Sequence, residues 1–275
     1  MERIIMLGTG SPWAVRCYNS SFLIENNGEY LLVGTGGGNG ILRQLADAGI
    51  SVNDIHNIFL SNGHPDHVMG IVWLINEISA AMRDETYEGD LRVYCSTDII
   101  DLVKNVCGLL LPKKLTWNFD HRIIFVSIFD TDVRKIAGYS FSFFDIRSSK
   151  DREFGFSVTL GNGEKLTYAG ETPLTEACFD AARGSDWLIH PVYCLHSQVD
   201  RYDPYGKGLM TVKEACELAG YLGVPRLIMF STEDDSLRRR EDLYRAEGRL
   251  YYKGEIYVPS DLETVTFSQD VGDSV

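Results

Sequence analysis

Residues 55–67 read IHNIFLSNGHPDH, and this stretch decides how the rest of the chain is interpreted. Its apolar first part predicts a strand, and Pro65 and Asp66 suit the first turn of a helix, because proline fits that turn and a carboxylate offsets the helix dipole. His64, Asp66 and His67 thus lie in a strand-to-helix turn, which can aim them at one zinc, manganese or iron ion. The alternative is a helix-capping Asp66 beside two ordinary surface histidines.

The patterns on either side of this stretch alternate between strands and helices. Apolar runs bounded by turn residues predict strands, and apolar residues at helical spacing predict helices. The expected strands are residues 3–7, 21–25, 29–33, 55–60, 91–95, 123–128, 139–145, 154–160, 165–169, 187–190 and 225–230, and the expected helices include residues 41–48, 65–78 and 211–222. Two β-rich halves with helices outside them predict a four-layer αββα sandwich of the α/β (α+β) class. We expect a single domain over residues 1–275.

Composition and charge restrict the classes of function. The chain has 275 residues, of which 44% are hydrophobic and 24% charged, as is ordinary for a globular protein. Its net charge of −13 disfavours nucleic acid and anionic membranes as partners, because both are polyanions. No apolar run reaches the roughly 18 residues that span a bilayer. The 6 cysteines are scattered without a CxxC pair, and no export signal is visible, so we expect reduced thiols and a cytoplasmic protein.

Two further segments could be mistaken for phosphate-binding sites. Residues 34–40 are rich in glycine, but they lack both the Gly-Lys-Ser/Thr ending and the GxGxxG spacing, so we expect a tight strand-to-helix turn. Residues 238–240 are three consecutive arginines. A solvated helix face is the favoured interpretation of this tract, and a phosphate site is the alternative.

Three other groups of polar residues carry open alternatives. His190, Cys194 and His196 are close in sequence, but their spacing does not establish that they meet at a metal ion. The segment from His196 to Lys207, with Tyr202 and Tyr205, either forms the wall of a substrate cleft or covers the edge of the sandwich. Residues 233–235 are acidic and are expected to cap the following helix rather than to recruit a cation.

The ordered set of motifs resembles the metallo-β-lactamase superfamily, in particular its ribonuclease Z-like and small phosphodiesterase branch. Six segments of this chain match segments of the family, and the family's own motif is given after each. They are residues 7–12 (the first-strand turn), 30–38 (a strand ending in Asp-x-Gly), 61–67 (the His-x-His-x-Asp-His loop), 168–172 (Ser-Gly-Asp-Thr), 187–190 (Leu-Leu-Ile-His-Glu) and 211–228 (a Ser-Thr-x-x-Glu-Ala helix and its strand). They span about residues 4 to 235. The resemblance implies the αββα fold and a site for two metal ions.

Several of the implied ligand positions are changed. His64, Asp66 and His67 match the histidine loop, and Glu171 replaces the bridging aspartate. Positions at which the family has histidine are occupied by other residues, namely Asn62, Arg147 (the best alignment within residues 145–149) and Ser231. Two supporting acidic positions are also changed, to Gly34 and Pro191.

These replacements argue against two zinc ions. Asparagine is a weak neutral donor, and the guanidinium of Arg147 cannot ligate a cation and repels it. A single zinc or manganese ion on Asp66, His67 and Glu171 is the most that we expect, and no metal at all is the alternative. Gly34 also removes a carboxylate that would orient a ligand.

Two hypotheses about function follow. In the favoured one, the chain is a catalytically impaired relative of metal-dependent hydrolases that binds a small anionic molecule, through Arg147, or an unknown protein. In the alternative, it is an active hydrolase of a phosphodiester, lactone or other small ester. His64, Asp66, His67 and Glu171 would then hold one metal ion or the water that it activates, and Arg147 would stabilise developing negative charge. A tRNA-processing nuclease ranks lowest because of the acidic charge, and a homodimer is suggested only by the resemblance.

Overall fold

The computed structural model describes residues 2–148 and 151–267, and in these residues two sheets of seven strands face each other. The first sheet contains β1 (Glu2–Gly8), β2 (Ser21–Asn26), β3 (Glu29–Val33), β4 (Asn57–Phe59), β5 (Leu91–Cys95), β6 (Ile123–Ser127) and β14 (Thr264–Thr266). The second contains β7 (Val133–Ile136), β8 (Tyr139–Asp145), β9 (Phe154–Thr159), β10 (Lys165–Tyr168), β11 (Trp187–Pro191), β12 (Arg226–Phe230) and β13 (Glu255–Tyr257). The strand orders are β14-β1-β2-β3-β4-β5-β6 and β13-β12-β11-β10-β9-β8-β7.

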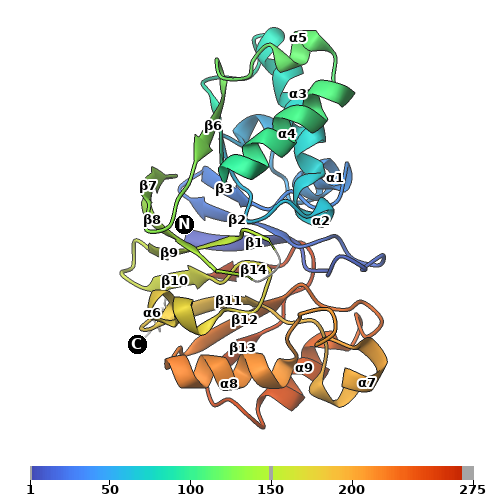
Figure 1. Ribbon diagram of the computed structural model, residues 1–275, viewed down its shortest axis with the longest axis vertical. Coiled ribbons are helices and arrows are strands. Elements are labelled where there is room, and N and C mark those ends of the chain that lie inside the picture. The colour runs from blue at the N-terminus through green and yellow to red at the C-terminus, as the bar shows by residue number, and fades with distance from the viewer. Residues whose placement is uncertain (1, 149–150, 268–275) are drawn as a thin grey trace, which may run out of the picture.

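Helices cover the outer side of each sheet (Figure 1). They are α1 (Gly40–Asp47), α2 (Pro65–Val68), α3 (Gly70–Arg83), α4 (Thr97–Leu110), α5 (Lys113–Thr116), α6 (Phe179–Ala182), α7 (Val199–Tyr202), α8 (Val212–Leu222) and α9 (Arg240–Gly248). Apolar side chains of α1, α3 and α4 pack on the first sheet, and those of α8 and α9 pack on the second. The predicted four-layer αββα sandwich is therefore confirmed.

Aromatic side chains fill the space between the two sheets. In β8 the side chains alternate between buried and exposed, which directs Phe141 and Phe143 inward. From the facing sheet Phe59 contacts this layer, with ring centroids 5.3 Å from Phe143 and 5.5 Å from Phe156. Burial of each such ring contributes roughly 2–3 kcal/mol. The two sheets therefore hold each other through one continuous apolar layer.

Helix α8 shows how local sequence sets an element's ends. Thr211 and Glu214 form a capping box at its start, and Gly223 ends it with a φ of 71°, a conformation that glycine adopts without strain. The prediction of a helix over residues 211–222 is confirmed to within one residue. The expected tight turn over residues 34–40 is also confirmed, since these residues connect β3 directly to the start of α1.

Each sheet contains four neighbouring parallel strands, and this topology positions the candidate site. In the first sheet β3, β4, β5 and β6 are parallel, and in the second β10, β11, β12 and β13 are parallel. The carboxyl ends of parallel strands meet at one edge of a sheet, where loops that follow them can converge. The segments that follow β4, β10 and β12 contain the predicted site residues at 62–67, 171 and 231, and residues 65–67 of these lie in α2.

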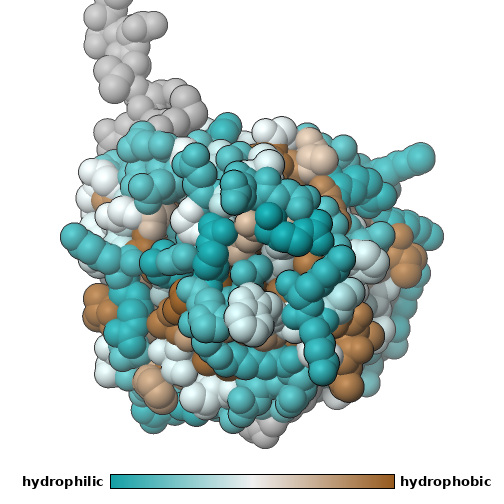
Figure 2. All heavy atoms as spheres, turned by 90° about the horizontal axis from the view of Figure 1, so that it is seen from above, coloured by the Kyte–Doolittle hydropathy of each residue, from teal (hydrophilic) through white to brown (hydrophobic). Residues whose placement is uncertain are grey.

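The outer surface at the end of the molecule that contains α3, α4 and α5 is shown in Figure 2. Seen from above, from the α3–α5 end, it is mainly hydrophilic with separate hydrophobic patches (Figure 2). No helix in residues 2–148 and 151–267 has the length and apolar character needed to cross a membrane.

Candidate functional site

A pocket of about 380 Å³ opens at the edge where the loops of both sheets meet. Its walls come from five segments of the chain, which contribute Pro12, Trp13, His64, Pro65, Asp66, His67, Glu171, Thr172, Lys207, Gly208, Leu209 and Ser231. The structure thus brings together residues that are up to 219 positions apart in sequence (231 − 12 = 219). Of the predicted site residues, His64, Asp66, His67, Glu171 and Ser231 line the pocket.

His67 is the centre of a buried cluster at the base of this pocket. Its Nε2 lies 3.1 Å from Oδ2 of Asp66 and 3.6 Å from Oε2 of Glu171. Burial alone would lower the pKa of His67, but the charges of Glu171 and Asp66 raise it to about 9. Burial would raise the pKa of Asp66, but the hydrogen bond with His67 lowers it below its ordinary value. Burial raises the pKa of Glu171 to about 8, against the opposing charge of His67. At neutral pH the cluster retains protons that isolated side chains would lose.

A second buried carboxylate, Glu153, holds the segment that carries Glu171. It accepts hydrogen bonds from the backbone N–H groups of Glu171 and Thr172, and its Oε2 accepts one of 2.8 Å from the Thr172 hydroxyl. Tyr168 donates a hydrogen bond of 2.7 Å to Oε1 of Glu171. Burial raises the pKa of Glu153. Sequence reasoning missed Glu153, because nothing in its neighbourhood distinguishes it from a surface residue at the start of a strand.

The other ring nitrogen of His67, Nδ1, is buried and lacks a hydrogen-bond partner among the described residues. A Cβ atom placed on Gly34 would lie 3.7 Å from this nitrogen. Gly34 is the position at which the resemblance implies an orienting aspartate, so the structure agrees with the expected loss of outer support for His67.

Two of the predicted site residues, His64 and Arg147, pair with surface carboxylates rather than with the cluster. His64 lines the pocket, but its Nε2 lies 2.9 Å from Oδ2 of Asp151, an exposed residue. Arg147 has a side chain that is 64% exposed and lies 3.6 Å from Asp130, so it is outside the pocket wall. Asn62 is fully buried, and its Oδ1 accepts a hydrogen bond from the backbone N–H of His64. Ser149, at the end of the stretch aligned with the downstream histidine, lies outside the described residues.

Trp13 and Lys207 form a wall of the pocket that sequence reasoning only partly found. The Nζ atom of Lys207 lies 4.9 Å from the ring centroid of Trp13 and 4.8 Å from that of Tyr193. It also donates a hydrogen bond of 2.6 Å to the carbonyl of Tyr202. The segment that ends at Lys207 was expected either to form the wall of a substrate cleft or to cover the edge of the sandwich, and Lys207 itself lines the pocket. The only sequence signal for Trp13 was its place directly after the first-strand turn.

Two other candidate groups do not assemble into sites. His190 is buried, burial lowers its pKa to about 4, and its Nδ1 donates to the carbonyl of Pro191. His196 instead lies 3.4 Å from Glu214, so the two histidines have different partners. The expectation that residues 233–235 cap a helix is wrong. Glu233 accepts hydrogen bonds from the backbone of residues 235 and 236, and α9 begins only at residue 240.

The sequence of this chain is similar to those of known proteins. A family model described as anti-Pycsar protein Apyc1 matches residues 2–201, which is most of the chain. The chain belongs to the Apyc1 family. This Apyc1-family chain is also 28% identical to the ribonuclease Z of Pyrococcus abyssi over 262 residues, a match that covers 79% of this chain and 82% of that protein.

Solved structures show the same fold. The metallo-β-lactamase fold protein YhfI from Bacillus subtilis has a TM-score of 0.75 at 16% identity, covering 97% of this chain and 100% of that one. The short form of human tRNase Z has a TM-score of 0.71 at 18% identity, with the same two coverages of 97% and 100%. The resemblance to the metallo-β-lactamase superfamily and its ribonuclease Z-like branch is therefore confirmed for this Apyc1-family chain.

The fold of this Apyc1-family chain implies metal ions, and the side chains around the pocket are the groups that could hold them. Within residues 2–148 and 151–267, no group of three or more His, Cys, Asp or Glu side chains is arranged to hold a metal ion. The ring of His64 pairs with a surface carboxylate, and Arg147 lies outside the pocket. What the pocket keeps is one imidazole, that of His67, with the two carboxyl groups of Asp66 and Glu171.

Proposed function

We propose that this chain binds a small anionic molecule in the pocket and does not carry out the two-metal hydrolysis implied by its fold. The observation that carries the proposal is the rearranged set of ligand positions. His64 pairs with Asp151, and Arg147 pairs with Asp130. The side chain of Asn62 accepts a hydrogen bond from the backbone N–H of His64 within the same turn. The pocket itself is nevertheless retained, with a volume of about 380 Å³.

The preference for an anion comes from the charges that line this pocket. Lys207 supplies an ammonium group at the wall, next to the exposed face of Trp13. Asp66 is paired with His67, so its charge is largely compensated within the cluster. Arg147 was expected to contact the anion, and since it pairs with Asp130 away from the pocket, we assign that contact to Lys207 instead.

The same features bear on the partners and the location of the protein. The relatives named ribonuclease Z suggest RNA, but the net charge of −13 opposes the electrostatic attraction on which RNA binding depends, so we propose no nucleic acid partner. All six cysteines are free, which is consistent with a reducing compartment, and we propose the cytoplasm.

A hydrolase with one metal ion is the second candidate, and a specific observation favours it. The distances of 3.1 and 3.6 Å from His67 Nε2 to Asp66 and Glu171 are those of groups that could approach a common ion. Oε2 of Glu171 is also buried without a hydrogen-bond partner among the described residues. A bound zinc or manganese ion would supply an activated water and polarise the scissile group.

One experiment separates the two candidates. The purified protein is dialysed against zinc or manganese, its metal content is measured per chain, and phosphate binding is measured by calorimetry. We expect no metal above background and a phosphate affinity that falls at least about tenfold in Lys207→Met, since a charged contact contributes about 1.5–3 kcal/mol. Lys213→Met is the matched control, because Lys213 also lies over an aromatic ring, 5.5 Å from the centroid of Tyr251, but outside the pocket.

Two outcomes would overturn the proposal. About one tightly held metal ion per chain that is lost in His67→Ala, together with metal-dependent hydrolysis of a phosphodiester, would establish the second candidate. An absence of both metal and phosphate binding would exclude the anion pocket.

A further inference from the structure

The arginine tract at residues 238–240 lies beside a second cleft, separate from the pocket described above. This cleft has a volume of about 610 Å³ and is lined by Arg16, Asp235, Ser236, Leu237, Arg238, Arg239 and Leu243. None of these residues lines the first pocket. The two sites are nevertheless neighbours along the chain, because the loop after β1 contributes Trp13 to the pocket and Arg16 to the cleft.

The charge of this cleft is opposite in sign to that of the whole chain. Its lining contains three guanidinium groups and one carboxylate, whereas the chain carries a net charge of −13. Asp235 is already shared, since it pairs with Arg16 and with Arg201. Among the described residues, no carboxylate or other hydrogen-bond acceptor pairs with the guanidinium group of Arg238 or Arg239, whereas the backbone N–H of Arg239 donates to the carbonyl of Ser236. Two positive charges of the cleft are therefore uncompensated by the parts of the chain that the structure describes.

The backbone that holds these arginines is anchored to the interior. Arg240 does not lie on a solvated helix face, as the tract was expected to do. It is 1% exposed, and its guanidinium donates to the hydroxyls of Thr232 (2.7 Å) and Thr9 (3.0 Å) and to a carbonyl at residue 259. This buried group attaches the start of α9 to the ends of β1 and β12. The expectation is wrong for Arg240 because these oxygens satisfy its charge inside the fold.

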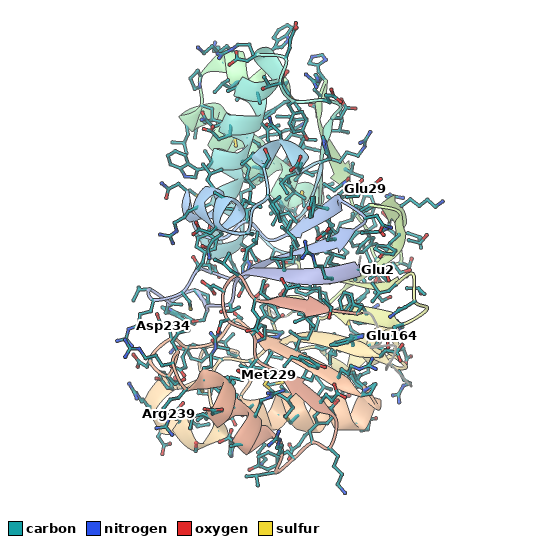
Figure 3. The ribbon with its side chains drawn as sticks, turned by 180° about the vertical axis from the view of Figure 1, so that it is seen from behind. Glu2, Glu29, Glu164, Met229, Asp234 and Arg239 are labelled. Atoms are coloured by element: carbon teal, nitrogen blue, oxygen red, sulfur yellow. The ribbon has the colours of Figure 1, made fainter. Side chains whose placement is uncertain are left out.

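The facing side of the cleft is fixed as well. Oδ2 of Asp234 accepts hydrogen bonds of 2.6 Å from the backbone N–H groups of Val15 and Arg16. This contact ties the loop after β1 to the loop after β12, so the two loops that carry the arginines are joined. Figure 3 shows Asp234 and Arg239 on one side of the molecule, with Glu2, Glu29 and Glu164 on the other.

We propose that this arginine cleft is a second binding site, and that it takes a small soluble anion with a pyrophosphate group. Guanidinium groups match phosphate oxygens in bidentate geometry, and they keep their charge at every physiological pH. A ligand with at least two negative charges would balance the two uncompensated arginines. The cleft is large enough for two linked phosphate groups rather than a single phosphate.

The test is calorimetric titration of the full chain with inorganic pyrophosphate at low salt. In the double variant Arg238→Gln/Arg239→Gln we expect the affinity to fall at least about tenfold, because each charge-assisted hydrogen bond contributes about 1.5–3 kcal/mol. The matched control is Arg92→Gln/Arg183→Gln, which removes two exposed arginines outside the cleft. The two Gln substitutions at 238 and 239 remove no side-chain hydrogen bond or ion pair within the described residues, and the thermal midpoint serves as a check that both variants are folded.

A variant in the first pocket distinguishes pyrophosphate binding in the cleft from anion binding in that pocket. Lys207→Met should leave pyrophosphate binding unchanged, since Lys207 does not line the cleft. Loss of pyrophosphate binding in Lys207→Met, with no effect of the two cleft substitutions, would place the anion in the first pocket and overturn this proposal. Equal affinity in the wild type, the cleft variant and the control would overturn it too, as would an absence of pyrophosphate binding.

Discussion

The buried network at the base of the pocket contrasts with an exposed segment outside the pocket. On the side of β10, Glu171 and its neighbours are buried and joined by hydrogen bonds through Glu153 and Tyr168. On the side of the loop after β8, Arg147 is exposed and paired only with a surface carboxylate. A polar side chain inside a buried network is constrained by all its partners, because an unpaired group in the interior is costly. The frame of the pocket is therefore fixed by buried hydrogen bonds, whereas the exposed Arg147 is held only by an ion pair at the surface.

Removal of Glu153 should give the largest effect. Glu153→Ala would leave the backbone N–H groups of Glu171 and Thr172 and the Thr172 hydroxyl without their acceptor. We expect the free energy of unfolding to fall by about 3 kcal/mol, measured by urea denaturation. Asp151→Ala, which removes an exposed carboxylate paired with His64, is the control and should change it by less than about 0.5 kcal/mol. Equal losses in the two variants would show that the buried and exposed sides do not differ.

The pH dependence of stability should sharpen the comparison. Glu171 has its pKa raised from 4.5 to about 8 and His67 from 6.5 to about 9, so the folded protein holds protons that the unfolded chain releases. The free energy of unfolding should therefore fall as the pH rises from 4.5 to about 8 because of Glu171, and from 6.5 to about 9 because of His67. The fall is at most about 1.4 kcal/mol per pH unit for each group. Glu171→Gln should flatten this decline, which chemical denaturation across a pH series would measure.

The control for this pH series is Glu176→Gln, which changes an exposed glutamate in the segment that follows Glu171. This variant should show the same decline of the unfolding free energy with pH as the wild type. If Glu171→Gln declined as steeply as the wild type, the raised pKa of Glu171 would not be a source of the pH dependence.

The smallest effect is expected at His64. Its ring pairs with exposed Asp151, and such surface pairs contribute about 0–1 kcal/mol. His64→Ala should therefore leave the unfolding free energy within about 0.5 kcal/mol of the wild type and leave phosphate binding in the pocket unchanged. A strong loss of binding, measured by the same calorimetry, would instead mean that His64 turns toward the ligand and belongs with the buried side.

The architecture was predictable because its signals are local and repeated. The apolar run before residue 61 and the turn with Pro65 place β4 and α2, and the hairpin around Gly28 places β2 and β3. Strands β7, β13 and β14 were not predicted, because each has only three or four residues and acquires its conformation from a neighbouring strand.

The site was predictable only where a motif carries it. Asp66, His67 and Glu171 lie in segments that match the superfamily, and the structure brings them together. Glu153 and Trp13 reach the site through tertiary packing, which leaves no periodic or spacing signal in the chain. The side-chain direction of Arg147 was likewise not predictable, since it depends on the distant partner Asp130.

The pairing of β1 has a consequence for how the chain folds during synthesis. β1 lies between β2 and β14, and Asp261 accepts hydrogen bonds from the backbone of Thr9 and Tyr18. Since β1 is synthesised long before β14, it keeps one open edge until residues 264–266 have been made. Contacts of such long sequence separation form late, and an unpaired strand edge can pair with another chain. A nascent chain stalled before residue 261 should therefore depend on chaperones more than the complete protein does.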